Sequence, residues 1–87
     1  MEKFNLHIKS GAVETLDGVP QKTRRRLIAL IRKLAVDPVP EGAERLSGAD
    51  KYRLRHEDFR LVYWVDSEEM RVVVAGIARR QPQMGFQ

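Results

Sequence analysis

The stretch that decides the fold runs from residue 52 to residue 80 and reads YRLRHEDFRLVYWVDSEEMRVVVAGIARR. Three apolar-rich runs are separated by two short charged segments, which is the pattern of an antiparallel meander. Apolar side chains occupy every second position of the central run, at Phe59, Leu61, Tyr63 and Val65. They share one face of the predicted strand, and the alternate positions point to the other face.

The arginines of this stretch indicate a binding function. A tight hairpin at residues 56–59 would place Arg55 opposite or diagonal to Arg60, with Arg53 two residues further along the same face. Because like charges opposed across a sheet destabilise it by up to ~1 kcal/mol per pair, such a sheet is expected to hold an anion. Alternatively, each arginine pairs with a carboxylate or lays its stem along the sheet. The carboxylates considered for such pairing are Glu44, Glu57 and Asp58.

Size and composition set limits on the class of protein. The 87 residues form one domain, residues 1–87, with a single core. The absence of cysteine excludes a disulfide framework and a thiolate metal site. No apolar run reaches membrane-spanning length and no signal peptide is evident, so we expect a cytoplasmic protein with no membrane contact, metal or other cofactor. The net charge of +4 is consistent with nucleic acid, with an acidic protein partner, or with no particular partner.

The first twenty residues predict a strand followed by a short helix. Apolar and polar residues alternate from Lys3 to Lys9, which predicts a short strand with one buried face and a solvated His7. We expect Ser10 to cap the first helix and Gly18 to end it. Pro20 then opens the second helix at its first turn.

The second helix is predicted from Gln21 to Val36. Its apolar stripe consists of Leu27, Leu30, Ile31 and Leu34. Its opposite face, the basic helix face, consists of Lys22, Arg25, Arg32 and Lys33. A one-signed face is either simply solvated or a surface for an acidic partner or distant phosphates. Asp37 and Pro38 end the helix.

The remaining elements complete the fold. We expect a linker from Ala43 to Lys51, a turn at residues 66–69, two-sided burial of Val72–Val74, and a bulge or close backbone approach at Gly76. The predicted fold class is α+β with the order β-α-α-β-β-β. Two N-terminal helices pack on one face of a mainly antiparallel four-stranded sheet, and the arginine-bearing face stays open.

The chain resembles the RelE/ParE toxin superfamily of bacterial toxin–antitoxin systems over nearly its whole length. The resemblance rests on four segments: Asp37-Pro38, residues 44–48 (ERLSG), residues 52–55 with 59–63 (YRLR and FRLVY), and residues 74–80 (VAGIARR). The most specific block is formed by residues 52–55 and 59–63, in which an aromatic residue is followed by Arg-Leu-Val-Tyr. The resemblance implies a RelE-like fold of the microbial ribonuclease type.

The favoured RelE branch implies a ribosome-dependent mRNA endoribonuclease that uses no metal. In this branch, the ribose 2′-OH attacks the adjacent phosphate. The basic residues that stabilise this phosphate align with Arg53, Arg55, Arg60 and Arg80. The implied substrate-binding residues are Arg79, Phe86 and Lys51. Fixed guanidinium groups are suited to the negative charge that develops on phosphoryl oxygens.

Phe86 departs from the family pattern, because RelE-type nucleases usually carry a tyrosine at this position. Phenylalanine can stack on a base but cannot move a proton. Cleavage could then be slower and rest on arginine electrostatics alone, or the chain could belong to a branch that does not cut RNA. A third reading assigns the proton transfer to another group. The groups considered are His56, Glu57 and Tyr52.

Three functions therefore compete at this stage. The favoured one is the mRNA endoribonuclease, and the alternatives are a ParE-type inhibitor of DNA gyrase and an inactive toxin retained for complex formation. Each implies a RelB-like antitoxin with an acidic segment that wraps the toxin as a helix or an added strand, in a toxin–antitoxin hetero-oligomer. The nuclease further implies the ribosome and mRNA as partners. The basic helix face and the arginine-bearing sheet face are the expected docking surfaces.

Overall fold

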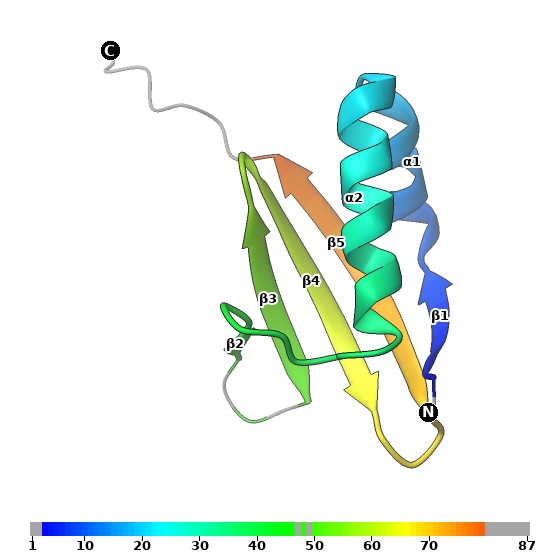
Figure 1. Cartoon of the computed structure of the whole chain (residues 1–87), viewed down its shortest axis with the longest axis vertical. Coiled ribbons are helices and arrows are strands. Elements are labelled where there is room, and N and C mark those ends of the chain that lie inside the picture. Colours follow the sequence, from blue (N-terminus) through cyan, green and yellow to red (C-terminus); the bar gives the residue numbers. More distant parts are fainter. Residues whose placement is uncertain (1–2, 47, 49, 80–87) are drawn as a thin grey trace.

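The computed structural model describes residues 3–46, 48 and 50–79. Its elements, in chain order, are β1 (Asn5–Ile8), α1 (Ser10–Gly18), α2 (Gln21–Leu34), β2 (Glu44–Arg45), β3 (Lys51–His56), β4 (Phe59–Asp66) and β5 (Arg71–Arg79) (Figure 1). No helix in these ranges is long and apolar enough to cross a membrane.

The strands form one mixed sheet in the order β1-β5-β4-β3-β2. β1 pairs with β5 in parallel, whereas the other neighbours are antiparallel. This confirms the predicted α+β fold, in which two helices pack on a mainly antiparallel sheet. The strand count differs by one, because Glu44 and Arg45 lie in the predicted linker but pair with Arg53 and Tyr52 of β3.

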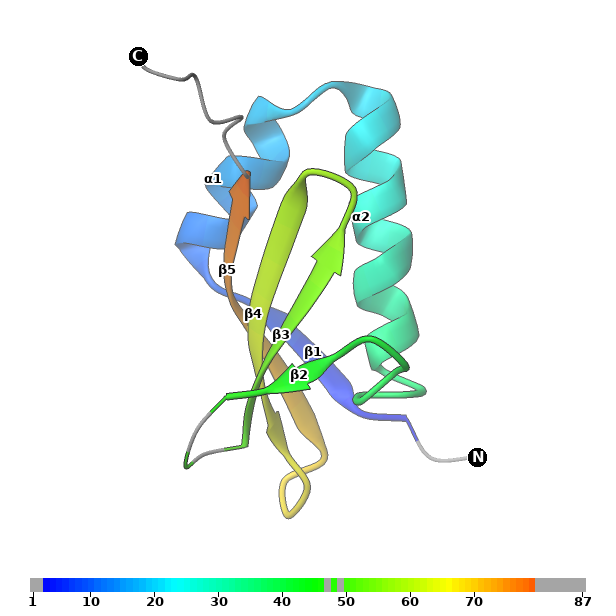
Figure 2. The ribbon, with the colours of Figure 1, turned by 90° about the vertical axis from the view of Figure 1, so that its left-hand side faces the viewer.

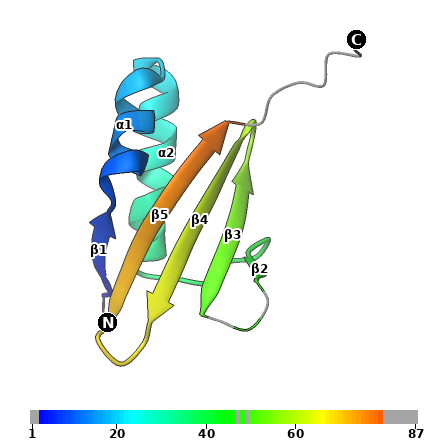
Figure 3. The same ribbon diagram turned by 180° about the vertical axis from the view of Figure 1, so that it is seen from behind.

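The molecule has a helical layer and a sheet layer. α2 lies across one face of the sheet, and α1 lies beside the end of β5 that extends past the short β1 (Figures 1 and 2). Seen from behind, none of the described helices covers β3, β4 or β5 (Figure 3). We call this uncovered side the open face and the side against α2 the core face.

The helices differ from the prediction at their ends. Ser10 is the first residue of α1 rather than its cap, since Lys9 holds the cap position without a side-chain hydrogen bond. Pro20 likewise caps α2 instead of opening its first turn. The end of α1 is bound by Arg24 of α2, whose Nε donates to the carbonyl of Leu16 at 2.9 Å. This bond adds to the long one at 3.5 Å from the backbone N–H of Val19, so the Leu16 carbonyl at the helix end is satisfied.

α2 supplies the apolar stripe that covers the sheet. Leu27, Ile31 and Leu34 are buried, whereas Leu30 is only partly buried at the edge of the core. The helix ends at Leu34, two residues before the predicted Val36. The predicted stripe therefore covers the core with three of its four members.

β5 contains an irregularity that the sequence only partly predicts. Val62 is paired with Gly76 and Tyr63 with Val74, so Ala75 is an extra residue on β5. The bulge expected near Gly76 is thus present. The prediction that residues 72–74 are buried on both faces was wrong for Val73, which points to the open face and is partly exposed.

Tyr63 joins the sheet to the turn after α2. Its side chain is fully buried, its ring stacks on Tyr52 with centroids 5.7 Å apart, and its hydroxyl donates to the carbonyl of Pro38 at 2.7 Å. Burial, with smaller contributions from Tyr52 and Asp37, raises the pKa of Tyr63 to about 12. The phenol therefore acts as a neutral structural donor near neutral pH.

Replacing Tyr63 by phenylalanine is expected to lower the free energy of unfolding by about 1–2 kcal/mol near neutral pH, because the Pro38 carbonyl loses its donor. The phenol has a folded-state pKa of about 12 and an unfolded-state pKa of about 10. Its stabilising contribution is therefore complete below about pH 10 and is lost as the pH rises toward about 12. Urea unfolding across this range should show the two proteins converging in stability. A constant difference would contradict the buried-donor role.

Candidate anion-binding site

Arg55 and Arg60 lie directly opposite each other on neighbouring strands, β3 and β4. The preceding pair, Leu54 and Leu61, is buried on the core face. Since side chains alternate along a strand, both arginines must point to the open face. A two-residue turn fixes this register, with Glu57 in the left-handed region at φ 55°. The predicted opposition of two arginines is therefore present, and we call it the arginine pair.

The arginine pair has unmet hydrogen-bonding capacity. The Nε of Arg60 is buried and has no hydrogen-bond partner among the residues that the structure describes. Within the same ranges, neither Arg55 nor Arg60 forms an ion pair with a carboxylate. A buried donor without an acceptor is unfavourable. Two adjacent guanidinium groups with free donors match the oxygens of a phosphate.

Small residues border the arginine pair on β5. Ala78 is the register partner of Arg60, and Gly76 is the partner of Val62. A Cβ atom added at Gly76 would meet no atom within 4 Å, so the space above this position is open. An anion can therefore approach Arg60 across β5 without meeting a large side chain.

Arg53 behaves differently from the arginine pair. Its Nη2 and Nε donate to Oε1 of its cross-strand neighbour Glu44 at 2.8 and 3.2 Å. This hydrogen bond, then the charge of Arg53 and a smaller contribution from Arg55, lower the pKa of the Glu44 carboxyl. The alternative interpretation of the sequence, in which an arginine pairs with a carboxylate, thus applies to Arg53. It does not apply to Arg55 and Arg60.

The other predicted site residues do not gather at one place. Lys51 is on the open face, with its Nζ 5.6 Å from the centroid of the Trp64 ring. Arg79 is the register partner of Phe59, and its guanidinium carbon lies 6.0 Å from that ring. It therefore points to the core-face side, away from the arginine pair. Arg80 and Phe86 lie outside the described residues.

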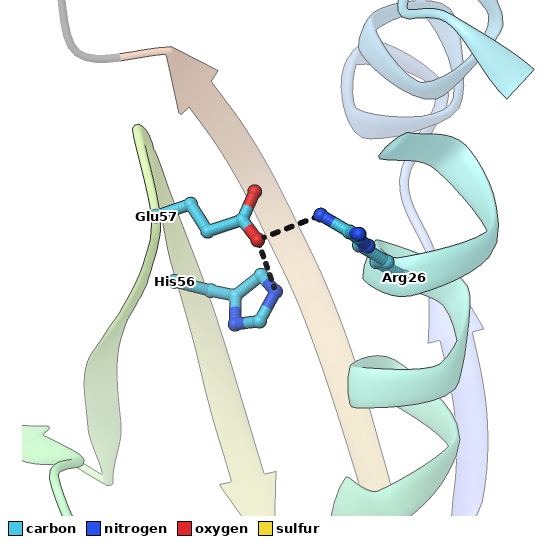
Figure 4. A network of polar contacts seen from close by, with 3 residues as sticks. All are labelled: Arg26, His56 and Glu57. Atoms are coloured by element: carbon cyan, nitrogen blue, oxygen red, sulfur yellow. Dashed lines mark hydrogen bonds and ion pairs between the residues drawn. The ribbon is translucent and has the colours of Figure 1, made fainter. Parts of the chain in front are cut away.

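The three groups considered for proton transfer all lie on the core-face side. Glu57 accepts a hydrogen bond from Arg26 of α2 at 3.1 Å and lies 3.9 Å from Nε2 of His56 (Figure 4). His56 pairs with the buried Phe59. Tyr52 stacks on the core residue Tyr63. The sheet therefore separates each of these groups from the arginine pair.

Trp64 and Lys9 are open-face residues that do not belong to the site predicted from the sequence. The Nζ of Lys9 lies 4.4 Å from the centroid of the Trp64 ring. Alternation with Arg60 already placed Trp64 on this face. The approach of Lys9 depends on the parallel pairing of β1 with β5, for which the sequence carries no signal. No group of three or more His, Cys, Asp or Glu side chains in the described ranges is arranged to hold a metal ion.

Solved structures share this arrangement of helices and strands. The isolated RelE toxin of E. coli aligns with a TM-score of 0.81 and 19% identity, covering 93% of this chain and 88% of that chain. This chain has the RelE fold. The RelE-RelB complex of Pyrococcus horikoshii aligns with a TM-score of 0.80 and 23% identity over 93% of this chain and 99% of that chain. A RelBE toxin–antitoxin complex of Mycobacterium tuberculosis aligns with a TM-score of 0.76 and 20% identity, covering 92% of this chain and 94% of that chain.

The sequence itself matches no protein-family model and no curated protein. At these identities, the likeness to RelE structures establishes the fold. Chemistry on that fold depends on the residues at the site, because one fold hosts different functions. The arginine pair is the feature of this RelE-like chain that bears most directly on its function.

Replacing Ala78 by glutamate is expected to block the site, because the carboxylate would lie directly opposite Arg60 and neutralise it. Affinity for an inorganic polyphosphate, measured by calorimetry, should fall at least about tenfold, while the thermal midpoint stays equal or rises. Ala78→Gln is the matched control of the same size without the charge, and it should lose far less affinity. Equal losses in both variants would show that side-chain size, rather than charge, governs access.

Proposed function

We propose that this chain is the toxin of a type II toxin–antitoxin system and acts as a metal-independent endoribonuclease on ribosome-bound mRNA. The observation that carries the proposal is the arginine pair, two opposed guanidinium groups on the open face without an ion-paired carboxylate among the described residues. The RelE fold supports it. We place the protein in the cytoplasm, where its substrate is.

In the proposed reaction, a ribose 2′-OH attacks the adjacent phosphorus atom. A new bond forms between O2′ and phosphorus, and the bond from phosphorus to the 5′ oxygen of the next nucleotide breaks. The products are a 2′,3′-cyclic phosphate and a 5′-hydroxyl. Arg55 and Arg60 donate to the two non-bridging oxygens, whose negative charge grows in the transition state. Arginine is suited to this role because it stays charged and presents paired donors.

Proton transfer is the slow part of this scheme. The 2′-OH loses its proton to water and the leaving 5′ oxygen takes one from water, because His56, Glu57 and Tyr52 point to the core-face side. We therefore favour cleavage through arginine electrostatics alone, at a lower rate than a well-placed general base would give.

Three further residues complete the proposed site. Arg53 joins when a phosphate competes with Glu44 for its donors, because an exposed ion pair is weak. Arg80 and Phe86 are assigned from the sequence resemblance, as a further cation and as a stacking group. Arg79 is left out of this set, because it points to the opposite side of the sheet from the arginine pair.

We propose that an acidic segment of an antitoxin binds the basic helix face. Its four residues, Lys22, Arg25, Arg32 and Lys33, are all exposed on α2. The solved structure from Pyrococcus horikoshii is a RelE-RelB complex, and the one from Mycobacterium tuberculosis is a toxin–antitoxin complex. Since exposed charges are screened by salt, binding at this face should weaken as ionic strength rises.

Inhibition of DNA gyrase, as by ParE-type toxins, remains a second candidate. It is favoured by one observation, that His56, Glu57 and Tyr52 lie across the sheet from the arginine pair. An inhibitor that binds an enzyme needs no proton transfer, whereas a nuclease gains from it. A supercoiling assay with purified gyrase separates the two functions.

Cell-free translation with mapped mRNA ends tests the nuclease directly. The wild-type chain should stop translation and cut the message within codons at the ribosomal A site. Arg60→Ala should lower the cleavage rate about 10²–10³-fold, as expected for loss of one transition-state donor. Its thermal midpoint should stay equal or rise, because the substitution relieves the repulsion with Arg55.

Arg25→Ala is the matched control, since it removes the same charge from exposed α2 and should cleave normally. An intact message under full inhibition of translation, or no inhibition at all, would reject the nuclease, and the second of these results would leave the gyrase candidate. Equal losses for Arg25→Ala and Arg60→Ala would reduce the role of Arg60 to general positive charge.

A further inference from the structure

Trp64 forms a second feature of the open face, separate from the arginine pair. It lies between its register partners Val73 on β5 and Lys51 on β3. Its indole is partly exposed, and two ammonium groups lie over the ring, that of Lys9 at 4.4 Å and that of Lys51 at 5.6 Å from the centroid. Lys9 follows β1 and Lys51 begins β3, so the two lysines are far apart in the sequence and the fold itself brings them together.

The charges around Trp64 are not balanced by acids. Neither Lys9 nor Lys51 forms an ion pair with any residue in the described ranges. The closest acidic residue along β4 is Asp66, which lies 3.8 Å from Arg71 and accepts a hydrogen bond from the backbone of Glu69 at 3.0 Å. Two like charges beside one ring attract an anion, and the indole adds a flat apolar surface.

Trp64 and the arginine pair lie along one line on the sheet. Arg60 and Trp64 are four residues apart on β4 and face the same way, which corresponds to about 13 Å at about 3.3 Å per residue. Val62 lies between them, with open space at its partner Gly76. A few nucleotides of a single strand can span this distance. An aromatic ring beside a line of cations is the usual means of binding single-stranded nucleic acid.

We propose that Trp64, Lys9 and Lys51 form a base-stacking subsite for single-stranded RNA, a few nucleotides away from the phosphate held by the arginine pair. A base takes the place of the ammonium groups over the indole, and these groups swing aside to bind the phosphates on either side of the base. This subsite rests on the proposed function for its RNA ligand, and it fixes the position of the strand relative to Arg60.

Trp64 is the only tryptophan of the chain, so its fluorescence reports directly on the subsite. The probe is a short single-stranded RNA with 2′-O-methyl riboses, which lacks the attacking hydroxyl and cannot be cut by the proposed reaction. We expect saturable quenching with this probe, and little with inorganic tripolyphosphate or poly-glutamate. Equal quenching by tripolyphosphate or poly-glutamate would overturn the proposal in favour of a general anion or acidic-polypeptide contact, and absence of quenching would overturn it outright.

Variants separate stacking from charge. Trp64→Leu should bind a dye-labelled probe about tenfold more weakly by anisotropy, within the range expected for loss of one stacked base. Trp64→Phe, which keeps an aromatic face, should retain most of the affinity. The wild-type chain should also prefer the probe to its abasic counterpart, and Trp64→Leu should lose that preference. Equal affinity of the wild type for both probes would contradict base stacking, even if Trp64→Leu failed to fold.

Arg60→Ala distinguishes this subsite from the proposed reaction. In that variant the saturating quench should persist while the cleavage rate falls about 10²–10³-fold. If the wild-type chain shows the quench but cuts no message, the nuclease is wrong and the subsite stands. If it cuts the message without any quench, the subsite is wrong and the nuclease stands.

Discussion

The opposition of Arg55 and Arg60 across β3 and β4 is the constraint on which the proposed function depends. Nothing in the pair favours the fold, because two positive charges face each other at neighbouring positions. Leu54 and Leu61, the next pair along, set the arrangement by burying their side chains against α2. A slip of β3 by one residue against β4 would move Leu54 to solvent and Arg55 into the core. The core therefore holds the arginine pair together against its own repulsion.

The two faces of the sheet carry different kinds of side chain. The core face carries the apolar side chains, the Tyr63 bond to Pro38, and the contact of Glu57 with Arg26. The open face carries the arginine pair, Trp64 and its two lysines. The groups considered for proton transfer, His56, Glu57 and Tyr52, lie on the core-face side. This separation favours a mechanism of binding and electrostatic stabilisation, in which a phosphate is held and its developing charge is neutralised.

The sequence predicted most of the fold and part of the site. Alternation from Phe59 to Val65 defined both faces of β4, and the apolar stripe of α2 placed the helix. Contacts set by pairing of distant segments could not be read in the same way. Glu44 reaches Arg53 only because residues 44 and 45 form β2. Lys9 reaches Trp64 only because β1 joins the far edge of the sheet.

The face on which Arg79 lies is set by the bulge in β5 and differs from the one that simple alternation predicts. Val72 and Val74 face the core, and simple alternation would place Arg79 on the opposite side from them. The extra residue at Ala75 shifts the alternation by one, so Ile77 is buried and Arg79 follows it to the core-face side. Gly76 indicated an irregularity, but not which residues beyond it would change face.

A double-mutant cycle on the arginine pair tests the central claim most directly. The free energies of unfolding of the wild type, Arg55→Thr, Arg60→Thr and the double variant give the coupling between the two side chains. In low salt this coupling should be unfavourable, by up to about 1 kcal/mol. With saturating tripolyphosphate it should become favourable, because one anion bridges both guanidinium groups. A coupling that is zero in both conditions, or unchanged by the anion, would contradict the account.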